Sequence, residues 1–278
     1  LISMPVLLIM IPALIKIGGD TGSMLGARLS SAFHMGLGSH IHIVILQAGP
    51  SCREHTPLAV LGKMFRHLAE SVDVPVVVHL DHGYTLDDCR AALDAGFTSV
   101  MFDGSRKSLA QNISETAAIA EMAHAAGVSC EGEIGFVGYS GGERSAGTDP
   151  QQAAIFARET GVDAMAISVG NVHLQQNQEG GLDEAQIRAI EAATTVPLVI
   201  HGGSGVPLRQ RAALAEGSRI CKFNIGTELR MVFGEALRAA VNADMQRFDR
   251  VAILKETHQP VFDAARKVIR GMGATGRA

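Results

Sequence analysis

From residue 70 onward the chain repeats one pattern, in which a helical stretch is followed by a glycine, a short apolar run and a polar residue. Apolar runs of this length, rich in Val and Ile and bounded by turn residues, are typical of buried parallel strands. They predict strands at 41–46, 76–80, 99–102, 128–130, 164–168, 198–200 and 220–223. An eighth strand is expected near 24–29, where the pattern is weak.

The stretches between the runs carry helix start and stop signals. Thr85 and Asp88 have the spacing of a capping box, and Asp149-Pro150 fits an N-cap followed by proline. The glycines that precede the runs fit helix ends that need a positive φ: Gly96, Gly127, Gly161 and Gly217. Strands and helices alternate over about 250 residues without a linker, which predicts one α/β domain, a (β/α)₈ TIM barrel over residues 1–278.

Three of the predicted strands end at histidines, in the segment 79–82 (His-Leu-Asp-His), at His173 and at His201. Side chains at the carboxyl ends of parallel strands lie at the rim of the sheet, where α/β folds keep their chemistry. Three neutral imidazoles converging there predict a divalent-metal site that keeps one position for substrate or water. The Asp in this segment can orient a ligand or transfer a proton, although a buried His–Asp hydrogen bond would also explain it.

Two glycine-rich turns follow the last two predicted strands, at 201–205 and 224–228. Glycine lets backbone N–H groups approach an anion, and the helix starts after Gly205 and Thr227 add favourable dipole ends. Barrel enzymes commonly hold a phosphate at these two loops, so the turns predict a phosphate site.

A Gly/Ser-rich stretch at 138–147 follows the segment Glu131-Gly-Glu133. Its length and composition predict a mobile lid, and Glu143 is a candidate base carried on that lid. A solvated loop without a catalytic role is the alternative for the same segment.

The charge balance argues against nucleic-acid and membrane partners. The chain carries 24 Lys and Arg against 28 Asp and Glu, a net charge of −4, and it has no Trp. Neither a basic surface nor an aromatic-basic patch is therefore predicted. The four cysteines are far apart and include no Cys-x-x-Cys pair, which indicates the reduced thiols of a cytoplasmic protein.

The stretch 1–19 is very apolar and contains Pro5 and Pro12. It is too short and too interrupted for a membrane span, lacks a basic leader and shows no small-residue cleavage pattern. We expect a helix that covers the floor of the domain.

Taken together, these motifs resemble the class II, zinc-dependent ketose-bisphosphate aldolases, a family that includes fructose- and tagatose-1,6-bisphosphate aldolases. Over residues 70–228 the resemblance is carried, in order, by His-Leu-Asp-His-Gly, Phe-Thr-Ser-Val-Met-Phe-Asp-Gly-Ser, Glu-x-Glu-x-Gly, Gly-Asn-Val-His, His-Gly-Gly-Ser-Gly and Asn-Ile-x-Thr-Glu. It implies a lyase of carbohydrate metabolism that reversibly cleaves a ketose (bis)phosphate to dihydroxyacetone phosphate and an aldehyde. It also implies a homodimer or homotetramer.

The resemblance assigns roles to particular residues. The zinc ligands would be His82, His173 and His201. Asp81 would be the acid/base on the hydroxyl of the aldehyde half. Asp103 and Glu133 would lie near the metal, beside its ligands or as ligands in an alternative metal position. The dihydroxyacetone-phosphate half, with a monovalent cation (Na⁺ or K⁺) nearby, would be held by Gly202, Gly203, Ser204, Asn224 and Thr227.

The implied chemistry agrees with these residue types. Breaking a carbon–carbon bond next to a carbonyl develops negative charge, which a divalent cation stabilises as a Lewis acid. A carboxylate beside the cation can take the proton from the hydroxyl whose carbon becomes the aldehyde. A second base on a closing lid, for which Glu143 is the candidate, can exchange the proton on the nucleophilic carbon.

The chain departs from the family pattern at several positions. Leu174 follows the metal histidine where the family usually has glycine, and Glu143-Arg144 stands where an acidic pair is usual. The Ala-Phe-Asn-Val-like end of the first strand is not found in 22–38. Gly226 stands where fructose-bisphosphate enzymes often carry Asp, which favours a different ketose phosphate as the substrate.

Three other functions are compatible with parts of the chain. Lys222 shares a strand face with Asn224 and could serve a Schiff-base aldolase, but this leaves the three histidines unexplained. The segment 40–42 (His-Ile-His) suggests a zinc hydrolase, but it precedes its strand and would lie at the wrong end for catalysis. A barrel that has lost activity and binds a sugar phosphate as a regulatory or assembly subunit is the remaining alternative.

Overall fold

The computed structural model describes residues 15–17, 44–73, 75–178 and 181–272. Seven consecutive strands run parallel, and each pairs with the next along the chain: β2 Val44–Ala48, β3 Val76–Gly83, β4 Ser99–Phe102, β5 Ser129–Ile134, β6 Ala164–Ile167, β7 Leu198–Ile200 and β8 Ile220–Asn224. The chain therefore has an α/β fold in which the carboxyl ends of seven strands meet on one side of a curved sheet.

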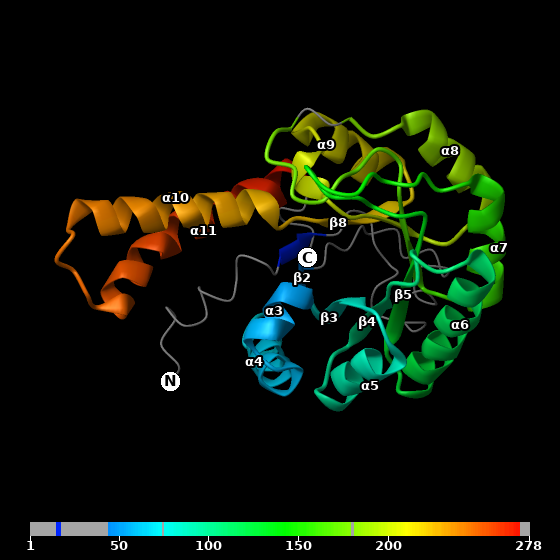
Figure 1. Cartoon of the computed structure of the whole chain (residues 1–278), viewed down its shortest axis with the longest axis horizontal. Helices are drawn as coiled ribbons and strands as arrows, with labels where there is room; N and C mark the ends of the chain where they lie inside the picture. Colours follow the sequence, from blue (N-terminus) through cyan, green and yellow to red (C-terminus); the bar gives the residue numbers. More distant parts are fainter. Residues whose placement is uncertain (1–14, 18–43, 74, 179–180, 273–278) are drawn as a thin grey trace.

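Helices connect the strands and lie outside the curved sheet (Figure 1). They are α3 Pro50–His55, α4 Leu58–Glu70, α5 Leu86–Asp94, α6 Leu109–Ala125, α7 Pro150–Thr160, α8 Glu184–Ala193, the short 3₁₀ helix η2 Gly203–Gly205, α9 Leu208–Gly217, α10 Thr227–Ala243 and α11 Arg250–Gly271. The alternation of strands and helices predicted from the sequence is confirmed over this part of the chain.

The helix signals read from the sequence are confirmed with one exception. Thr85 forms the predicted capping box at the start of α5, and Asp149 caps α7 ahead of Pro150. The glycines after α5, α6 and α7 adopt a positive φ: Gly96, Gly127 and Gly161. Gly217 is instead the last residue of α9 and has no positive φ, because that helix ends directly in an extended residue.

β1 Ile15–Ile17 runs antiparallel to both β2 and β8. It lies between the two outermost parallel strands, so the ring of strands closes through an antiparallel element. The helix expected over 1–19 is therefore wrong for Ile15–Ile17, because this backbone pairs with strands on both sides. The eighth strand expected near 24–29 lies outside the described residues.

Two strands are longer than their apolar runs indicate. β3 continues through Asp81 to Gly83, and β5 continues through Glu131 to Ile134. All of these residues are buried, so the polar side chains are part of the interior rather than of a loop. The two extensions place ionisable groups at the carboxyl ends of the strands on either side of β4, where the site is built.

Two apolar clusters support the sheet. The larger one packs the outer sheet face against the helices and includes Phe65 of α4 and Phe156 of α7. The smaller one consists of strand residues that face the inside of the ring: Ile45, Val77, Met101, Ala164, Ala166, Val199 and Cys221. All four cysteines of the chain are described and buried, and none forms a disulfide.

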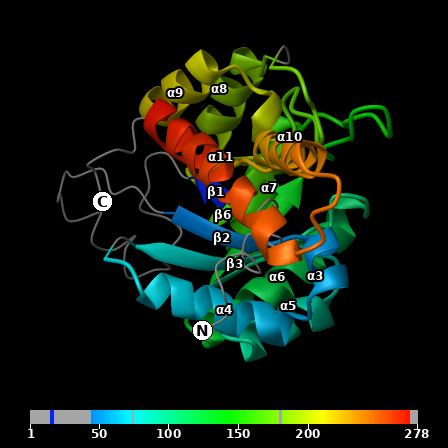
Figure 2. The ribbon, with the colours of Figure 1, turned by 90° about the vertical axis from the view of Figure 1, so that its left-hand side faces the viewer.

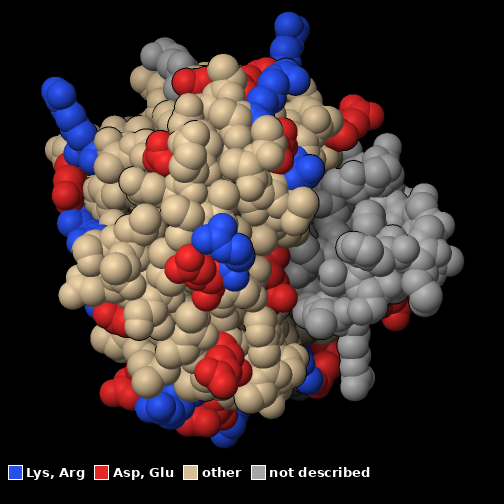
Figure 3. All heavy atoms as spheres, turned by 90° about the vertical axis from the view of Figure 1, so that its right-hand side faces the viewer, with Lys and Arg blue, Asp and Glu red and all other residues tan. Residues whose placement is uncertain are grey.

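The outer surface has one projecting feature. α10 and α11 pack against each other and extend away from the sheet (Figures 1 and 2), and their connection exposes Met245 and Phe248. On the face opposite to this pair, basic and acidic side chains are interspersed (Figure 3). Within the described ranges, no helix is both long and apolar enough to span a membrane.

We predict that Gly62→Ala destabilises the fold by about 1–3 kcal/mol, because a Cβ at this position in α4 would lie 2.1 Å from the carbonyl oxygen of Ala95. Thermal unfolding measures the effect. Gly217→Ala is the control, since its Cβ would meet nothing within 4 Å and its φ is not positive. Equal melting temperatures for the two variants would contradict the close packing of α4 on the end of α5.

Candidate active site

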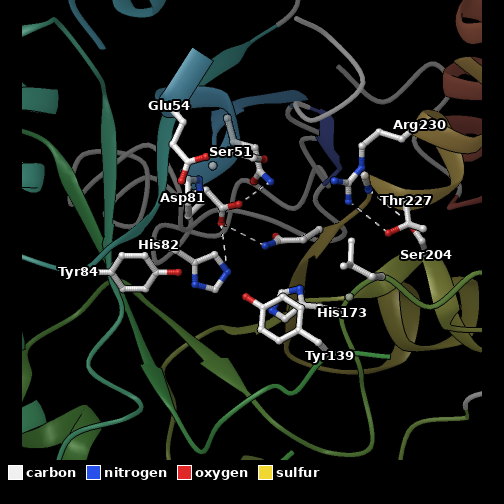
Figure 4. Close-up of a pocket in the computed structure, with 17 residues that line it drawn as sticks. Ser51, Glu54, Asp81, His82, Tyr84, Tyr139, His173, Ser204, Thr227 and Arg230 are labelled. Atoms are coloured by element: carbon white, nitrogen blue, oxygen red, sulfur yellow. Dashed lines mark hydrogen bonds and ion pairs between the residues drawn. The ribbon is translucent and has the colours of Figure 1, made fainter. Parts of the chain in front are cut away.

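A cavity of about 430 Å³ lies at the carboxyl ends of β2, β3 and β8 (Figure 4). Its lining includes seven of the residues predicted from the sequence: Asp81, His82, His173, Gly202, Ser204, Asn224 and Thr227. Residues that the sequence analysis did not single out complete it: Gln47, Gly49, Pro50, Ser51, Glu54, Tyr84, Tyr139 and Arg230. Leu174 and Gly226, noted only as departures from the family pattern, line it too.

The three predicted metal histidines converge at the floor of this cavity. One ring nitrogen from each of His82, His173 and His201 lies within 4.8 Å of the others. The closest approach joins His82 Nε2 to His201 Nδ1, which are 2.9 Å apart. His82 lies in β3 and His201 directly follows β7, whereas His173 lies in the loop six residues after the end of β6. Three imidazoles that converge in this way match the donor set of a catalytic zinc site.

His82 reaches this cluster because β3 bends at its end. The pairing of β3 with β4 shifts register between Leu80 and Gly83, and His82 adopts a left-handed backbone with φ 50°. Arg53 of α3 stabilises the bend, since its guanidinium donates hydrogen bonds to the carbonyl oxygens of Asp81 (2.8 Å) and His82 (3.1 Å). The sequence could not show this, because Arg53 lies outside the motifs.

His201 is oriented by a buried polar network beneath the cavity. Its Nε2 donates to Glu131 Oε1 at 2.9 Å, which leaves Nδ1 directed toward His82. Glu131 also pairs with the ammonium of Lys222, and this ammonium lies 3.3 Å from His79 Nε2. Lys222 is fully buried and does not line the cavity, so the Schiff-base alternative is not supported.

Asp103 and Glu133 form a second donor group with His82. His82 Nδ1 donates to Asp103 Oδ2 at 2.8 Å, and Glu133 Oε2 lies 3.8 Å from the same nitrogen. This buried oxygen of Glu133 has no hydrogen-bond partner among the residues that the structure describes. An unsatisfied buried carboxylate beside imidazoles fits a bound cation.

The charges in this group shift its pKa values. Burial raises the pKa of Glu133 to about 8, with a further contribution from the Asp103 carboxylate. Burial alone would lower the pKa of His82, but the carboxylates of Asp81, Asp103 and Glu133 outweigh it and raise that pKa to about 9. For Asp103, burial raises the pKa, but its hydrogen bond and charge interaction with His82, together with hydrogen bonds from Ser105, outweigh burial and lower the pKa.

The Asp81 carboxylate lies between the histidines and the rest of the cavity. Its Oδ1 is 3.9 Å from His82 Nε2, and its Oδ2 accepts a hydrogen bond from Gln47 Nε2 at 2.9 Å. Asn224 Nδ2 approaches Oδ1 at 3.5 Å from β8. Gln47 lies next to the last residue of β2, in a strand-end position like those predicted for the histidines, and this position was the available signal for it.

The two glycine-rich turns lie side by side on another wall of the cavity. Ser204 Oγ accepts hydrogen bonds from the backbone N–H groups of Gly226 and Glu228, both at 3.3 Å, which joins the turns. Gly203 lies behind this wall and does not line the cavity. Arg230 extends from the first turn of α10 beside Thr227 and adds a cation that the sequence analysis missed (Figure 4). Burial lowers the pKa of this guanidinium.

Glu143 lies outside the cavity in this structure. Its exposed carboxylate pairs with Arg106 at 2.7 Å, and Tyr139 from the same loop lines the cavity instead, stacked on His173. The loop is held by the backbone, since His173 N–H donates to the Gly138 carbonyl at 2.8 Å. A base on this loop would therefore require Glu143 to leave Arg106.

Fold and site together define an α/β enzyme with a candidate metal centre at the carboxyl ends of its strands. Residues 40–277 match the family model described as class-II fructose-bisphosphate aldolase, and the chain belongs to that family. It is accordingly a lyase, as the sequence motifs predicted.

Named relatives agree with this assignment. The chain is 36% identical over 213 residues to a fructose-bisphosphate aldolase of Geobacillus stearothermophilus, covering 75% of this chain and 74% of the relative. It is 38% identical over 227 residues to a 6-phospho-5-dehydro-2-deoxy-D-gluconate aldolase of Shouchella clausii, covering 80% of this chain and 76% of the relative. The crystal structure of the YdjI aldolase from Escherichia coli K12 superposes with a TM-score of 0.71 at 29% identity, covering 84% and 83%.

We predict that zinc affinity rises about tenfold per pH unit between pH 7 and pH 9. The raised pKa of His82, about 9, means that this ring keeps its proton below pH 9, and a cation at Nε2 must displace it. The affinity is measured by competition with a chelator, corrected for the protonation of the chelator, together with the number of protons released. A flat profile over this window would contradict the assignment of His82 as a ligand.

Proposed function

We propose that the chain is a zinc-dependent aldolase that reversibly cleaves a ketose phosphate to dihydroxyacetone phosphate and an aldehyde. The observation that carries the proposal is the Asp81 carboxylate, which lies beside the histidine cluster and lines the same cavity as the glycine-rich turns. One bound ketose phosphate can therefore reach the histidine cluster, the carboxylate and the anion site at once. The activities by which the relatives are named support a sugar of this class.

Zinc would be held by His82, His173 and His201, with Asp103 and Glu133 beside them or as ligands in an alternative position. The clustering of the donor atoms and the unsatisfied oxygen of Glu133 support this site among the described residues. Zinc bound there would act as a Lewis acid toward the negative charge that develops next to the carbonyl when the carbon–carbon bond breaks. A monovalent cation, Na⁺ or K⁺, near the phosphate is part of the same proposal.

Asp81 would move the proton of the reaction. In the cleavage direction its carboxylate accepts the proton of the hydroxyl whose carbon becomes the aldehyde, and in condensation it returns that proton. Gln47 and Asn224 hold the carboxylate from two sides, so it meets the hydroxyl without reorientation. This pre-ordering lowers the entropic part of the barrier.

The phosphate of the dihydroxyacetone half would be held by Gly202, Ser204, Asn224 and Thr227, with Gly203 supporting this wall from behind. The start of α10 at Thr227 directs backbone N–H groups toward an anion, and Arg230 supplies a full positive charge beside it. A Cβ at Gly226 would be in ordinary contact with Arg230, 3.6 Å from its Nη2, so a side chain would fit here and the glycine leaves this part of the cavity open. We therefore propose a ketose phosphate other than fructose 1,6-bisphosphate as the substrate.

The rest of the architecture is proposed on the same basis. The seven parallel strands favour a complete (β/α)₈ barrel forming a single domain over residues 1–278. Met245 and Phe248, exposed between α10 and α11, favour a homodimer or homotetramer with a buried contact at this projecting pair. Four buried thiols favour a cytoplasmic location, and the net charge of −4 opposes nucleic-acid partners.

We predict that Asp81→Ala lowers the rate of ketose phosphate cleavage by roughly 10²–10⁴-fold while zinc content and melting temperature change little. The reason is that the variant loses the proton acceptor but keeps the histidines. Cleavage of a panel of ketose phosphates is measured beside elemental analysis, with Asp87→Ala as an exposed carboxylate control. Wild-type protein that binds zinc and sugar phosphate but cleaves no member of the panel would instead indicate the regulatory or assembly subunit.

We predict that Glu143→Gln slows exchange of the dihydroxyacetone-phosphate proton with solvent more than it slows cleavage, and leaves zinc content unchanged. Asp81→Ala should show the opposite bias, because the two carboxylates handle protons on different carbons. The control is Glu115→Gln, a carboxylate that is also exposed and paired, with Lys107. Equal loss of cleavage and of proton exchange in Glu143→Gln would indicate that Glu143 only positions the substrate. Unchanged exchange would instead favour Glu131 or Glu133 as the base.

A further inference from the structure

Leu174 has a backbone conformation that its side chain disfavours. Its φ is 58°, and in the described residues only His82 shares a positive φ among residues other than glycine. In this conformation Cβ approaches the following carbonyl oxygen, which disfavours every L-residue, and glycine avoids the conflict. A leucine kept in this conformation is therefore evidence for a role of its side chain.

The surrounding structure imposes this conformation. On one side the segment lies directly on the turn after β7, where a Cβ on Gly202 would be 2.3 Å from the Val172 carbonyl oxygen. In the same way, a Cβ on Gly205 would be 2.3 Å from Oε1 of Gln175, so the Gln175 side chain packs directly on this turn. On the other side, the backbone of His173 is hydrogen-bonded to Gly138 and Ser140. Leu174 thus has a fixed backbone between two anchored neighbours.

The Leu174 side chain is 44% exposed and lines the cavity. It follows the candidate metal ligand His173, and its segment packs on the turn that begins the candidate phosphate site at Gly202 and continues to Ser204. Its side chain therefore lies between the candidate metal centre, where the substrate carbonyl would bind, and the candidate phosphate site. In a ketose phosphate, the group between these two is a methylene carbon.

We propose that Leu174 is a specificity-determining residue whose isobutyl group contacts the methylene between the carbonyl and the phosphate ester of the substrate. This inference rests on the proposed aldolase function and adds a contact that holds the dihydroxyacetone-phosphate half. The contact buries about half of the exposed part of this leucine side chain, which corresponds to an affinity gain of about fivefold. The strained backbone is the means by which this side chain is directed into the cavity.

The experiment follows exchange of the dihydroxyacetone-phosphate proton with deuterium by NMR, since this step needs no aldehyde. Leu174→Ala should raise the half-saturating concentration about fivefold, with the maximal rate within about twofold and zinc content unchanged. Leu174→Met keeps an apolar side chain of similar size and should restore the half-saturating concentration. Half-saturation at the wild-type concentration in Leu174→Ala would overturn the proposal.

A stability comparison tests the backbone argument without substrate. Leu174→Gly should melt about 2–4 °C above Leu174→Ala, because both lose the side chain and only glycine removes the strain. At Val60, exposed in α4, the order should reverse, since glycine is worse than alanine in a helix. The same order at both positions would overturn the assignment of strain to Leu174.

The aldolase function and the Leu174 contact are overturned by different results. Wild-type protein that binds zinc but neither exchanges the dihydroxyacetone-phosphate proton nor cleaves a ketose phosphate would overturn the aldolase function, and the Leu174 contact with it. Exchange by the wild type with no effect of Leu174→Ala would overturn the contact alone.

Discussion

The ion pair between Lys222 and Glu131 is the interaction on which the inside of the strand ring depends. Both side chains are almost completely removed from solvent, and a buried charge without its partner costs several kcal/mol. The pair joins β8 to β5 across the ring, and Glu131 then fixes His201 by accepting from its Nε2. A lysine that would be a nucleophile in another aldolase chemistry is here the counter-charge that lets a carboxylate orient His201, a candidate metal ligand.

Strand alternation explains how much of this site the sequence could predict. A polar residue at the end of an apolar run lies at the carboxyl end of a parallel strand, and the structure brings those ends together. Asp81, His82, His173 and His201 were found in this way, and the structure places them around one cavity and its floor. Their roles stay predictions, since the geometry supports them and only the experiments above test them.

The residues that the sequence analysis missed act through tertiary contacts. Arg53 reaches β3 from α3, and nothing in its local sequence indicates such a contact. Gln47 had a strand-end signal, but that signal does not reveal its hydrogen bond to Asp81. Arg230 lies on the first turn of a predicted helix, but only the folded structure shows that it lines the cavity. The Glu143 loop is the reverse case, because its composition indicates a lid while the structure pairs Glu143 with Arg106. Contacts between residues far apart in the chain leave no periodic pattern to read.

The electrostatics of the cavity floor give an independent argument for a cation. The pKa of an acid, Glu133, and the pKa of a base, His82, are both raised, and both shifts favour taking up a proton. Burial is the largest single effect in each case, and it raises the pKa of the acid but lowers the pKa of the base. The raised pKa of His82 therefore requires surplus negative charge around its ring. Glu131 is balanced by Lys222, which leaves Asp81, Asp103 and Glu133 around a single imidazole. A proton on His82 relieves this surplus only in part, whereas a divalent cation among the same groups relieves more of it and needs no proton there.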